Sequence, residues 1–302
     1  MQAMKVLVAT DGSACAQVAL DLVRSMPWPG QSEIHLVSVV DSSLPAYASI
    51  GPMNASDPIE RQGNLIGGIA NDLDKVADTL LADQRTVETH VLVGRPASAI
   101  VEEARTLDVD LIVMGSRGHG TIASMVLGSV SAEVADHAGC ATLVARRTTW
   151  SRAVLGVDGS RNAELALETV RDWPIFAATH IDVVSVAETE LPWTSSLALG
   201  GYGSGIDYPQ TERAIIADHV RWSERAARTL EASGRDVSWQ VPEGNPAQEL
   251  IRIAGTGDAD VVVVGTRGQT GLTRLLTGSV ARNVLVHSQS SVLVVKDGAA
   301  LP

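Results

Sequence analysis

Two stretches decide the fold of this chain: GSRGHGTIASMVLGS, residues 115–129, and GTRGQTGLTRLLTGS, residues 265–279. Both have the order Gly, two residues, Gly, nine residues, Gly, Ser, and each begins at the end of an apolar run, DLIVMG or DVVVVG. A strand that leads into a glycine-rich turn and then into a helix is a common backbone arrangement for holding a phosphate. The repeat therefore predicts two such modules in tandem.

The segments before these stretches repeat in the same order. A short β-branched run leads into TDGS at 10–13 and into VDGS at 157–160, and a helical pattern follows each. Ser13 and Ser160 are placed as N-caps of those helices. The chain is long enough for two domains, and we place the boundary so that they span residues 1–147 and 148–302.

Each copy predicts five strands that alternate with helices, with the second strands at 34–41 and 181–188. Such a pattern is typical of an α/β fold whose parallel sheet is covered on both faces. If the sheet is doubly wound with its first and fourth strands adjacent, the loops after those strands face one crevice. The repeated motifs then converge there.

Composition limits the ligands and the location. A net charge of −12 and a pI near 5.0 argue against a nucleic-acid surface. With only three lysines, an anion site must use Arg, backbone N–H groups and hydroxyls. The apolar runs are far shorter than the roughly 20 residues of a membrane span, and the N-terminus lacks the layout of a signal peptide. We expect a cytoplasmic protein without a membrane partner, in which Cys15 and Cys140 are packing residues.

Two long segments, 42–64 and 189–210, are rich in Pro, Gly and Ser. Each is either a lid over the site or an unordered insertion. A repeated Asp-x-Asp, at 108–110 and 258–260, could suggest a metal pair. It precedes the fourth strand, whereas ligands of open parallel sheets bind at the C-terminal ends, so we assign it to turn chemistry.

Each part of the glycine stretch has a chemical task. Glycines at 115, 118 and 128 let the backbone approach an anion, and Ser129 lies where helix N–H groups and the helix dipole favour a phosphate. Arg117 and Arg267 are either guanidinium ligands of the same phosphates or exposed charges at strand ends. The carboxylates of Asp11 and Asp158 suit a ribose hydroxyl, an adenine amine or Mg²⁺.

Rival phosphate motifs fail. The sequence contains no Gly-Lys-Ser/Thr, which excludes a P-loop. Residues 118–123, GHGTIA, match the dinucleotide fingerprint, but the second copy reads GQTGLT and no acidic residue ends the next strand. We interpret that match as accidental.

Taken together, these motifs resemble those of tandem universal stress proteins of the ATP-binding subgroup, over nearly the whole chain. The resemblance implies two Rossmann-like (HUP-type) domains with strand order 3-2-1-4-5. In the first copy it implies adenine and ribose contacts from Thr10, Asp11 and the Val39 backbone, and phosphate contacts from Gly115, Gly118, Gly128, Ser129 and Val130. The matching positions of the second copy are Val157, Asp158, Val186, Gly265, Gly268, Gly278, Ser279 and Val280.

The resemblance also implies that the two domains pair through their last strands, 142–145 and 292–295, as an internal pseudo-dimer. It leaves open whether two whole chains then associate as a homodimer. We expect a regulatory protein of the stress response that binds one ATP per domain and is read by a protein partner whose identity the sequence does not give. Neither a catalytic set nor a metal held by protein side chains is expected, and Mg²⁺ would join through the ATP phosphates. The alternatives are a slow ATPase or autophosphorylating enzyme, and a nucleotide-free scaffold.

Overall fold

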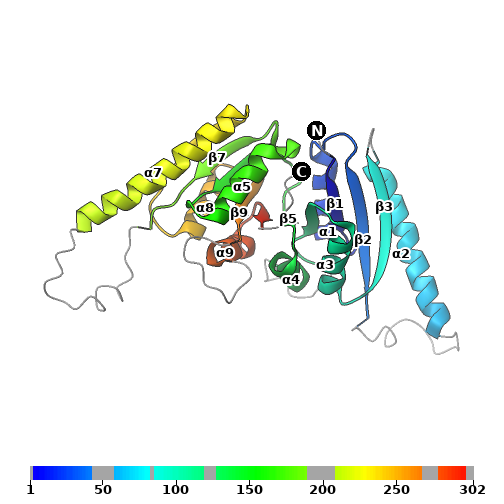
Figure 1. The fold of residues 1–302 in the computed structure, drawn as a ribbon. Coiled ribbons are helices and arrows are strands. Elements are labelled where there is room, and N and C mark those ends of the chain that lie inside the picture. Colours follow the sequence, from blue (N-terminus) through cyan, green and yellow to red (C-terminus); the bar gives the residue numbers. More distant parts are fainter. Residues whose placement is uncertain are drawn as a thin grey trace, which may run out of the picture. The chain divides into compact units, whose positions relative to one another are not determined.

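The computed structural model describes residues 3–42, 58–81, 85–118, 127–188, 208–266 and 278–296. The chain divides into two compact units, of which the first ends at Thr149 and the second comprises Trp150–Lys296. Colours from blue to blue-green mark the first unit in Figure 1, and colours from green to red mark the second. Both units follow the same plan, as the sequence repeat predicts.

The first unit is a five-stranded parallel sheet with helices on both faces. Its strand order is β3-β2-β1-β4-β5. Helix α1 packs with α2, and α3 packs with α4, so that the two pairs cover opposite faces. The elements are β1 (Lys5–Ala9), α1 (Ala14–Ser25), β2 (Glu33–Asp41), α2 (Pro58–Leu80), β3 (Thr86–Gly94), α3 (Pro96–Leu107), β4 (Leu111–Gly115), α4 (Ser129–His137) and β5 (Ala141–Ala145).

The second unit repeats this arrangement with the order β10-β9-β6-β7-β8, again parallel throughout. Helices α5 and α7 pack together, as do α8 and α9. The α/β class and the order 3-2-1-4-5 are thus confirmed in both units. The elements are β6 (Arg152–Gly156), α5 (Arg161–Asp172), a 3-10 turn η1 (Pro174–Phe176), β7 (His180–Val184), α7 (Tyr208–Ala232), β8 (Asp236–Gln240), α8 (Pro246–Thr256), β9 (Val261–Gly265), α9 (Ser279–His287) and β10 (Ser291–Val295).

The apolar runs of the sequence become the central strands. All five residues of β4 and of β5 are buried, because helices cover both faces of a parallel sheet. The outer strands β3 and β8 instead alternate exposed and half-buried positions over their first residues. This order leaves the C-terminal ends of β1 and β4 side by side at the switch point of the sheet.

The predicted helix starts are confirmed. The hydroxyl of Ser13 accepts a hydrogen bond from the Ala16 N–H at the start of α1, and Ser160 caps α5 in the same way. Pro96 and Pro246 are the first residues of α3 and α8, where the missing N–H of proline removes no helical hydrogen bond.

Two boundaries differ from the prediction. Helices α2 and α7 begin at Pro58 and Tyr208, so the segments expected to be irregular up to 64 and 210 are shorter. Proline is tolerated in the first turn of a helix, and both helices have one there, at 58 and 209. The remainder of each segment, where a lid was one of two alternatives, lies outside the described residues.

The second strand of the second unit is also shorter than predicted. β7 ends at Val184 instead of residue 188. An isolated bridge between Ala187 and Glu243, in the segment after β8, continues the pairing farther on. Pro242 explains the interruption, because its carbonyl accepts from the Ala187 N–H but proline has no N–H to return to the ladder.

Candidate functional site

The turn after β1 is held by its own backbone and side chains. The Thr10 N–H donates to the Val37 carbonyl at 2.9 Å, which extends the β1–β2 ladder by one residue. Asp11 Oδ1 accepts from the Ser13 N–H at 3.0 Å. Gly12 has φ of +77°, a conformation that glycine adopts without strain. The turn thus presents Asp11 at the C-terminal edge of the sheet with an exposed side chain.

The turn after β4 lies against this first turn. A Cβ atom built on Gly118 would collide with Oδ2 of Asp11, so only glycine fits beside that carboxylate without a shift. The Ser13 hydroxyl donates to the Arg117 carbonyl at 3.3 Å. The structure therefore brings Asp11 together with Arg117 and Gly118, which follow it by more than 100 residues in the chain.

Gly115 serves a different purpose. A Cβ there would lie 2.5 Å from the backbone carbon of Cys15 and 2.8 Å from the nitrogen of Ala16, so this glycine allows α1 to pack closely on the end of β4. Cys15 is half-buried and Cys140 is buried, and neither forms a disulfide bond.

The two ends of the glycine stretch also meet. The Gly128 N–H donates to the Ser116 carbonyl at 2.8 Å, and the Ser131 hydroxyl donates to the Gly115 carbonyl at 2.8 Å. Helix α4 therefore begins directly above the end of β4. Its N-cap, Gly128, supplies no side-chain hydrogen bond, and the first N–H groups of a helix have no intrahelical partner. Ser129 is exposed at this end of the helix.

Two arginines, Arg117 and Arg146, place positive charge near the turn after β4. The Arg146 guanidinium follows β5 and is largely buried; this burial and the nearby charge of Arg117 lower its pKa to about 10. A pKa of that size leaves Arg146 protonated at neutral pH. Two guanidinium groups that repel each other beside a glycine turn favour an anion between or near them. The sequence analysis missed Arg146, since the Arg146–Arg147 pair after the last strand matches no phosphate-binding motif.

Val39 and Val130 lie on the apolar side of the site. Val39, near the end of β2, and Val130, in the first turn of α4, are partly buried against the core cluster that contains Leu7, Val37 and Ile112. Their side chains therefore anchor the two backbones whose contacts the sequence analysis expected.

The second unit repeats the first turn. The Val157 N–H donates to the Val184 carbonyl at 2.9 Å, Asp158 Oδ1 accepts from the Ser160 N–H at 3.0 Å, and Gly159 has φ of +73°. Val157 is buried and has no hydroxyl, so only its backbone can take the place of Thr10. Val186 is buried beyond the end of β7.

The second glycine stretch is described only at its ends. Gly265 lies so close to Asn162 at the start of α5 that a Cβ would collide with the Asn162 carbonyl. The Gly278 N–H donates to the Thr266 carbonyl, as Gly128 does to Ser116, and α9 begins at Ser279, followed by Val280. Arg267 and Gly268 lie outside the described residues.

An aromatic pair distinguishes the second unit. The indole of Trp222, on α7, lies directly on Gly159, where a Cβ would come 2.6 Å from Nε1. His219 meets Trp222 edge to face with ring centroids 4.7 Å apart, and its Nδ1 lies 2.7 Å from the buried Ser185 hydroxyl. Sequence spacing alone does not place Trp222 on the turn, because the contact depends on tertiary structure.

The repeated Asp-x-Asp is part of the opposite edge of each sheet, as predicted. Asp108 is the C-cap of α3 with φ of 52°, and Asp258 follows the Gly257 C-cap of α8 with φ of 49°. Asp110 accepts from the Lys5 N–H at 2.8 Å, and Asp260 accepts from the N–H groups of Ser151 and Arg152. These contacts confirm the turn assignment.

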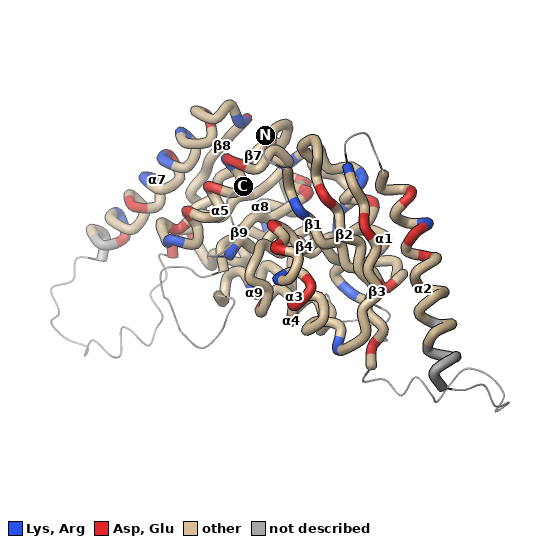
Figure 2. The backbone as a smooth tube through the Cα atoms, turned by 45° about the vertical axis from the view of Figure 1, so that its right-hand side comes forward, with Lys and Arg blue, Asp and Glu red and all other residues tan. Residues whose placement is uncertain are grey.

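Charge over the described residues is mixed rather than gathered in one basic surface. Figure 2 shows basic and acidic residues interspersed along α7. None of the described helices is long and apolar enough to cross a membrane.

Comparison with known proteins gives the family. The model of the Universal stress protein family matches residues 3–146 and again 149–296. The universal stress protein Rv2005c of Mycobacterium tuberculosis is 27% identical over 296 residues, which cover 95% of this chain and 93% of that protein. Rv2623 of the same organism is 25% identical over 305 residues, covering 97% and 96%.

Among solved structures, a universal stress protein from Archaeoglobus fulgidus aligns over 98% of this chain and 99% of its own with a TM-score of 0.61. At 17% identity this likeness supports the fold alone. The two family matches together cover nearly the whole chain, and the protein belongs, in both of its halves, to the universal stress protein family.

Proposed function

We propose that each unit binds one ATP in the crevice at the C-terminal ends of its first and fourth strands, and that the protein acts as a nucleotide-dependent regulator. The observation that carries the proposal is the contact of Gly118 with Asp11, which makes one wall from the two turns. The carboxylate of Asp11 can accept hydrogen bonds from the hydroxyls of a ligand. The N-terminus of α4, which follows the same glycine stretch, can attract its phosphates.

The distribution of charge supports a nucleoside phosphate over a simple anion. Asp11 would repel a free phosphate placed beside it, whereas a ribose hydroxyl can donate to it. Arg117 and Arg146 offer positive charge beside the glycine stretch, and the first turn of α4 offers N–H groups at its end. The residues proposed for the first unit are Thr10, Asp11, Val39, Gly115, Arg117, Gly118, Gly128, Ser129 and Val130.

For the second unit we propose Val157, Asp158, Val186, Gly265, Arg267, Gly268, Gly278, Ser279 and Val280. Trp222 and His219 add an aromatic surface beside Asp158. The equivalent positions of α2 carry Ile69 and Asp72, so the two sites offer different surroundings to the same ligand. We therefore propose that they bind ATP with different affinities.

The test is calorimetric titration of the nucleotide-free chain with ATP, ADP, AMP, cAMP and GTP. We expect ATP to bind with up to two sites per chain, Gly118→Glu to remove the site of the first unit, and Gly268→Glu to remove that of the second. Gly139→Glu and Gly255→Glu are matched controls, because a Cβ at either position meets nothing within 4 Å. Binding that survives the double variant Gly118→Glu/Gly268→Glu would sink the proposed sites.

The regulatory role has its own test. Steady phosphate release from ATP that disappears in Asp11→Asn/Asp158→Asn would replace the regulator with an ATPase. Release no faster from the wild type than from this double variant supports a protein that holds the nucleotide without consuming it.

A further inference from the structure

Two histidines and two glutamates meet on the first unit, away from the crevice. His35 lies near the start of β2, Glu88 and His90 lie on the adjacent strand β3, and Glu103 lies on α3. The strand register pairs His35 with Glu88 and Val37 with His90. Because side chains alternate between faces along a strand, His35, Glu88 and His90 share the face that α3 covers. We call these four residues the His35 cluster.

Three residues of the His35 cluster have side-chain atoms that are spaced as ligands of one ion. His35 Nδ1 lies 3.1 Å from His90 Nε2 and 3.6 Å from Glu88 Oε2, and His90 Nε2 lies 3.9 Å from the same Glu88 oxygen. A tetrahedral Zn²⁺ with bonds of about 2.0–2.1 Å keeps its ligand atoms about 3.3–3.4 Å apart. Shifts of about half an ångström or less would thus bring all three atoms within bonding distance of one metal.

Glu103 completes the arrangement from outside. Its Oε1 lies 3.3 Å from Nδ1 of His90, the ring nitrogen that does not face His35. A carboxylate on the second nitrogen of a metal-bound imidazole fixes the tautomer that leaves the first nitrogen as the ligand. In this geometry Glu103 is a positioning residue for His90.

The surroundings also suit a metal. Only 7% of the His35 side chain is exposed, while 66% of that of Glu88 is, so the cluster opens to solvent on the Glu88 side. With three protein ligands, a fourth position remains for water or another small ligand.

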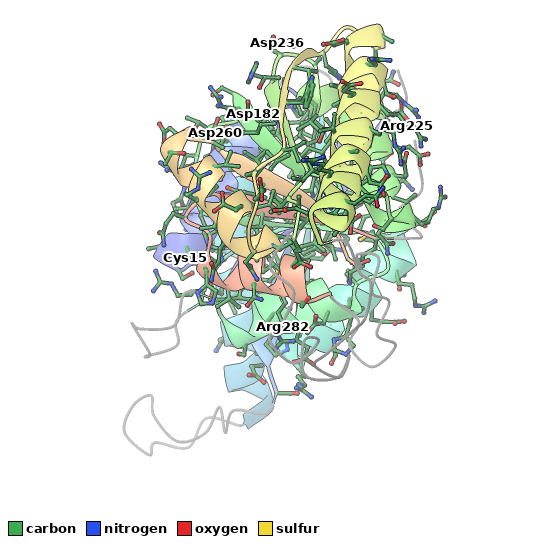
Figure 3. All side chains as sticks on the ribbon, turned by 90° about the vertical axis from the view of Figure 1, so that its left-hand side faces the viewer. Cys15, Asp182, Arg225, Asp236, Asp260 and Arg282 are labelled. Carbon is green, nitrogen blue, oxygen red and sulfur yellow. The ribbon has the colours of Figure 1, made fainter. Side chains whose placement is uncertain are left out.

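The second unit lacks this set. The strands equivalent to β2 and β3 carry Asp182, Ser238 and Gln240 in place of the three ligands. Asp182 instead pairs with Arg152 Nη2 at 2.7 Å and accepts from the Ser238 hydroxyl. Figure 3 labels Asp182 and the nearby Asp236, whose carboxylate lies 2.8 Å from His180. An internal ion pair has thus replaced the ligands in that unit.

From this geometry we propose that the first unit binds one divalent transition-metal ion of the Zn²⁺ class through His35 Nδ1, His90 Nε2 and a Glu88 carboxylate oxygen. Two imidazoles and one carboxylate form a ligand set that suits Zn²⁺ and its neighbours in the first row rather than Ca²⁺ or Mg²⁺. The ion would tie the outer strand β3 to β2. The site is separate from the proposed nucleotide site, which lies at the C-terminal ends of the strands, since His35, Glu88 and His90 all precede the last four residues of β2 and β3.

The experiment uses the full, untagged chain, stripped with a chelator and free of nucleotide, titrated with Zn²⁺ by calorimetry and with Co²⁺ by visible absorption. We expect one equivalent to bind, intense absorption bands typical of tetrahedral Co²⁺, and a higher thermal midpoint with Zn²⁺. A titration without saturable binding, or with Mg²⁺ competing equally, would overturn the proposal.

Variants locate the ion. Glu103→Gln, which removes a partner of a ligand, should weaken Zn²⁺ binding roughly 10–100-fold and alter the Co²⁺ spectrum. Glu88→Gln and His90→Gln, which each remove a ligand, should weaken Zn²⁺ binding by more than this. Glu88 is exposed, so its variant should fold as the wild type does when chelator is present. His180→Gln is the matched control, a histidine beside two carboxylates in the second unit, and should change nothing. Binding that survives both Glu88→Gln and His90→Gln would assign the ion to another site.

Discussion

The hydroxyl of Ser13 donates a hydrogen bond to the carbonyl of Arg117 at 3.3 Å, and this bond joins the turn after β1 to the turn after β4. The same hydroxyl accepts from the Ala16 N–H at 3.2 Å as the N-cap of α1. One side chain thus couples the start of a helix to the position of the glycine stretch. Stability and ligand binding in the first unit should therefore both depend on it.

Replacing Ser13 with alanine should lower the free energy of unfolding by about 0.5–2 kcal/mol, the usual cost of losing an N-cap. It should also weaken binding of ATP to the first unit, because the Arg117 backbone loses its anchor. Ser13→Thr, which keeps the hydroxyl, is the control. Urea unfolding and calorimetry measure the two effects, and equal behaviour of the Ala and Thr variants would contradict the coupling.

Asp260 should matter for stability far more than its neighbour in the same motif. Its Oδ2 accepts from the Ser151 N–H at 2.6 Å, the Ser151 hydroxyl at 2.7 Å and the Arg152 N–H at 3.0 Å, where β6 begins. Figure 3 labels Asp260. Asp260→Asn should cost about 1–3 kcal/mol, since an amide cannot accept as many hydrogen bonds as a carboxylate.

Asp258→Asn is the matched control for this change. Asp258 is exposed with φ of 49°, a conformation that asparagine adopts readily. We expect its unfolding midpoint to stay close to that of the wild type. A loss of stability as large as that of Asp260→Asn would mean that the motif acts as a whole rather than through the three hydrogen bonds of Asp260.

The fold was predictable from the sequence because its signals are local. Glycine spacing, serine N-caps such as Ser13 and prolines such as Pro96 report on the backbone within a few residues of themselves, and their repetition 147–150 residues later makes chance agreement improbable. Element ends were less predictable. The early end of β7 depends on Pro242, which is distant in sequence and acts only through the pairing of two strands.

The parts of the sites that were missed depend on tertiary placement. His35 and His90 lie 55 residues apart, and nothing in either segment reveals that the register of β2 and β3 brings their rings within 5.3 Å. Trp222 and Gly159 likewise meet only because α7 crosses the turn after β6. Helical spacing can assign Trp222 to a face of α7, but it cannot identify the glycine that this face contacts.

His219 should make the second unit less stable in acid. Burial lowers the pKa of His219, an effect that outweighs the raising influence of Asp158 and Asp218. The unfolded chain therefore takes up a proton on this residue more readily than the folded one, so stability should fall as the pH drops below the ordinary histidine value of 6.5. His219→Gln should reduce this fall in thermal midpoints measured across that pH, whereas His137→Gln, an exposed histidine of α4, should not. Identical profiles for the wild type and His219→Gln would contradict this assignment.

Trp222 should report nucleotide binding to the second unit, if the proposed ATP site is correct. Its indole covers Gly159 beside Asp158, so a ligand that contacts this turn must change the surroundings of the ring. We expect ATP to change the tryptophan fluorescence of the wild type and of Gly118→Glu, which keeps only the second site. Trp222→Phe should remove the change although calorimetry still detects binding, and Trp239→Phe, on the exposed face of β8, should leave it intact. A fluorescence change that persists in Trp222→Phe would place the nucleotide away from this turn.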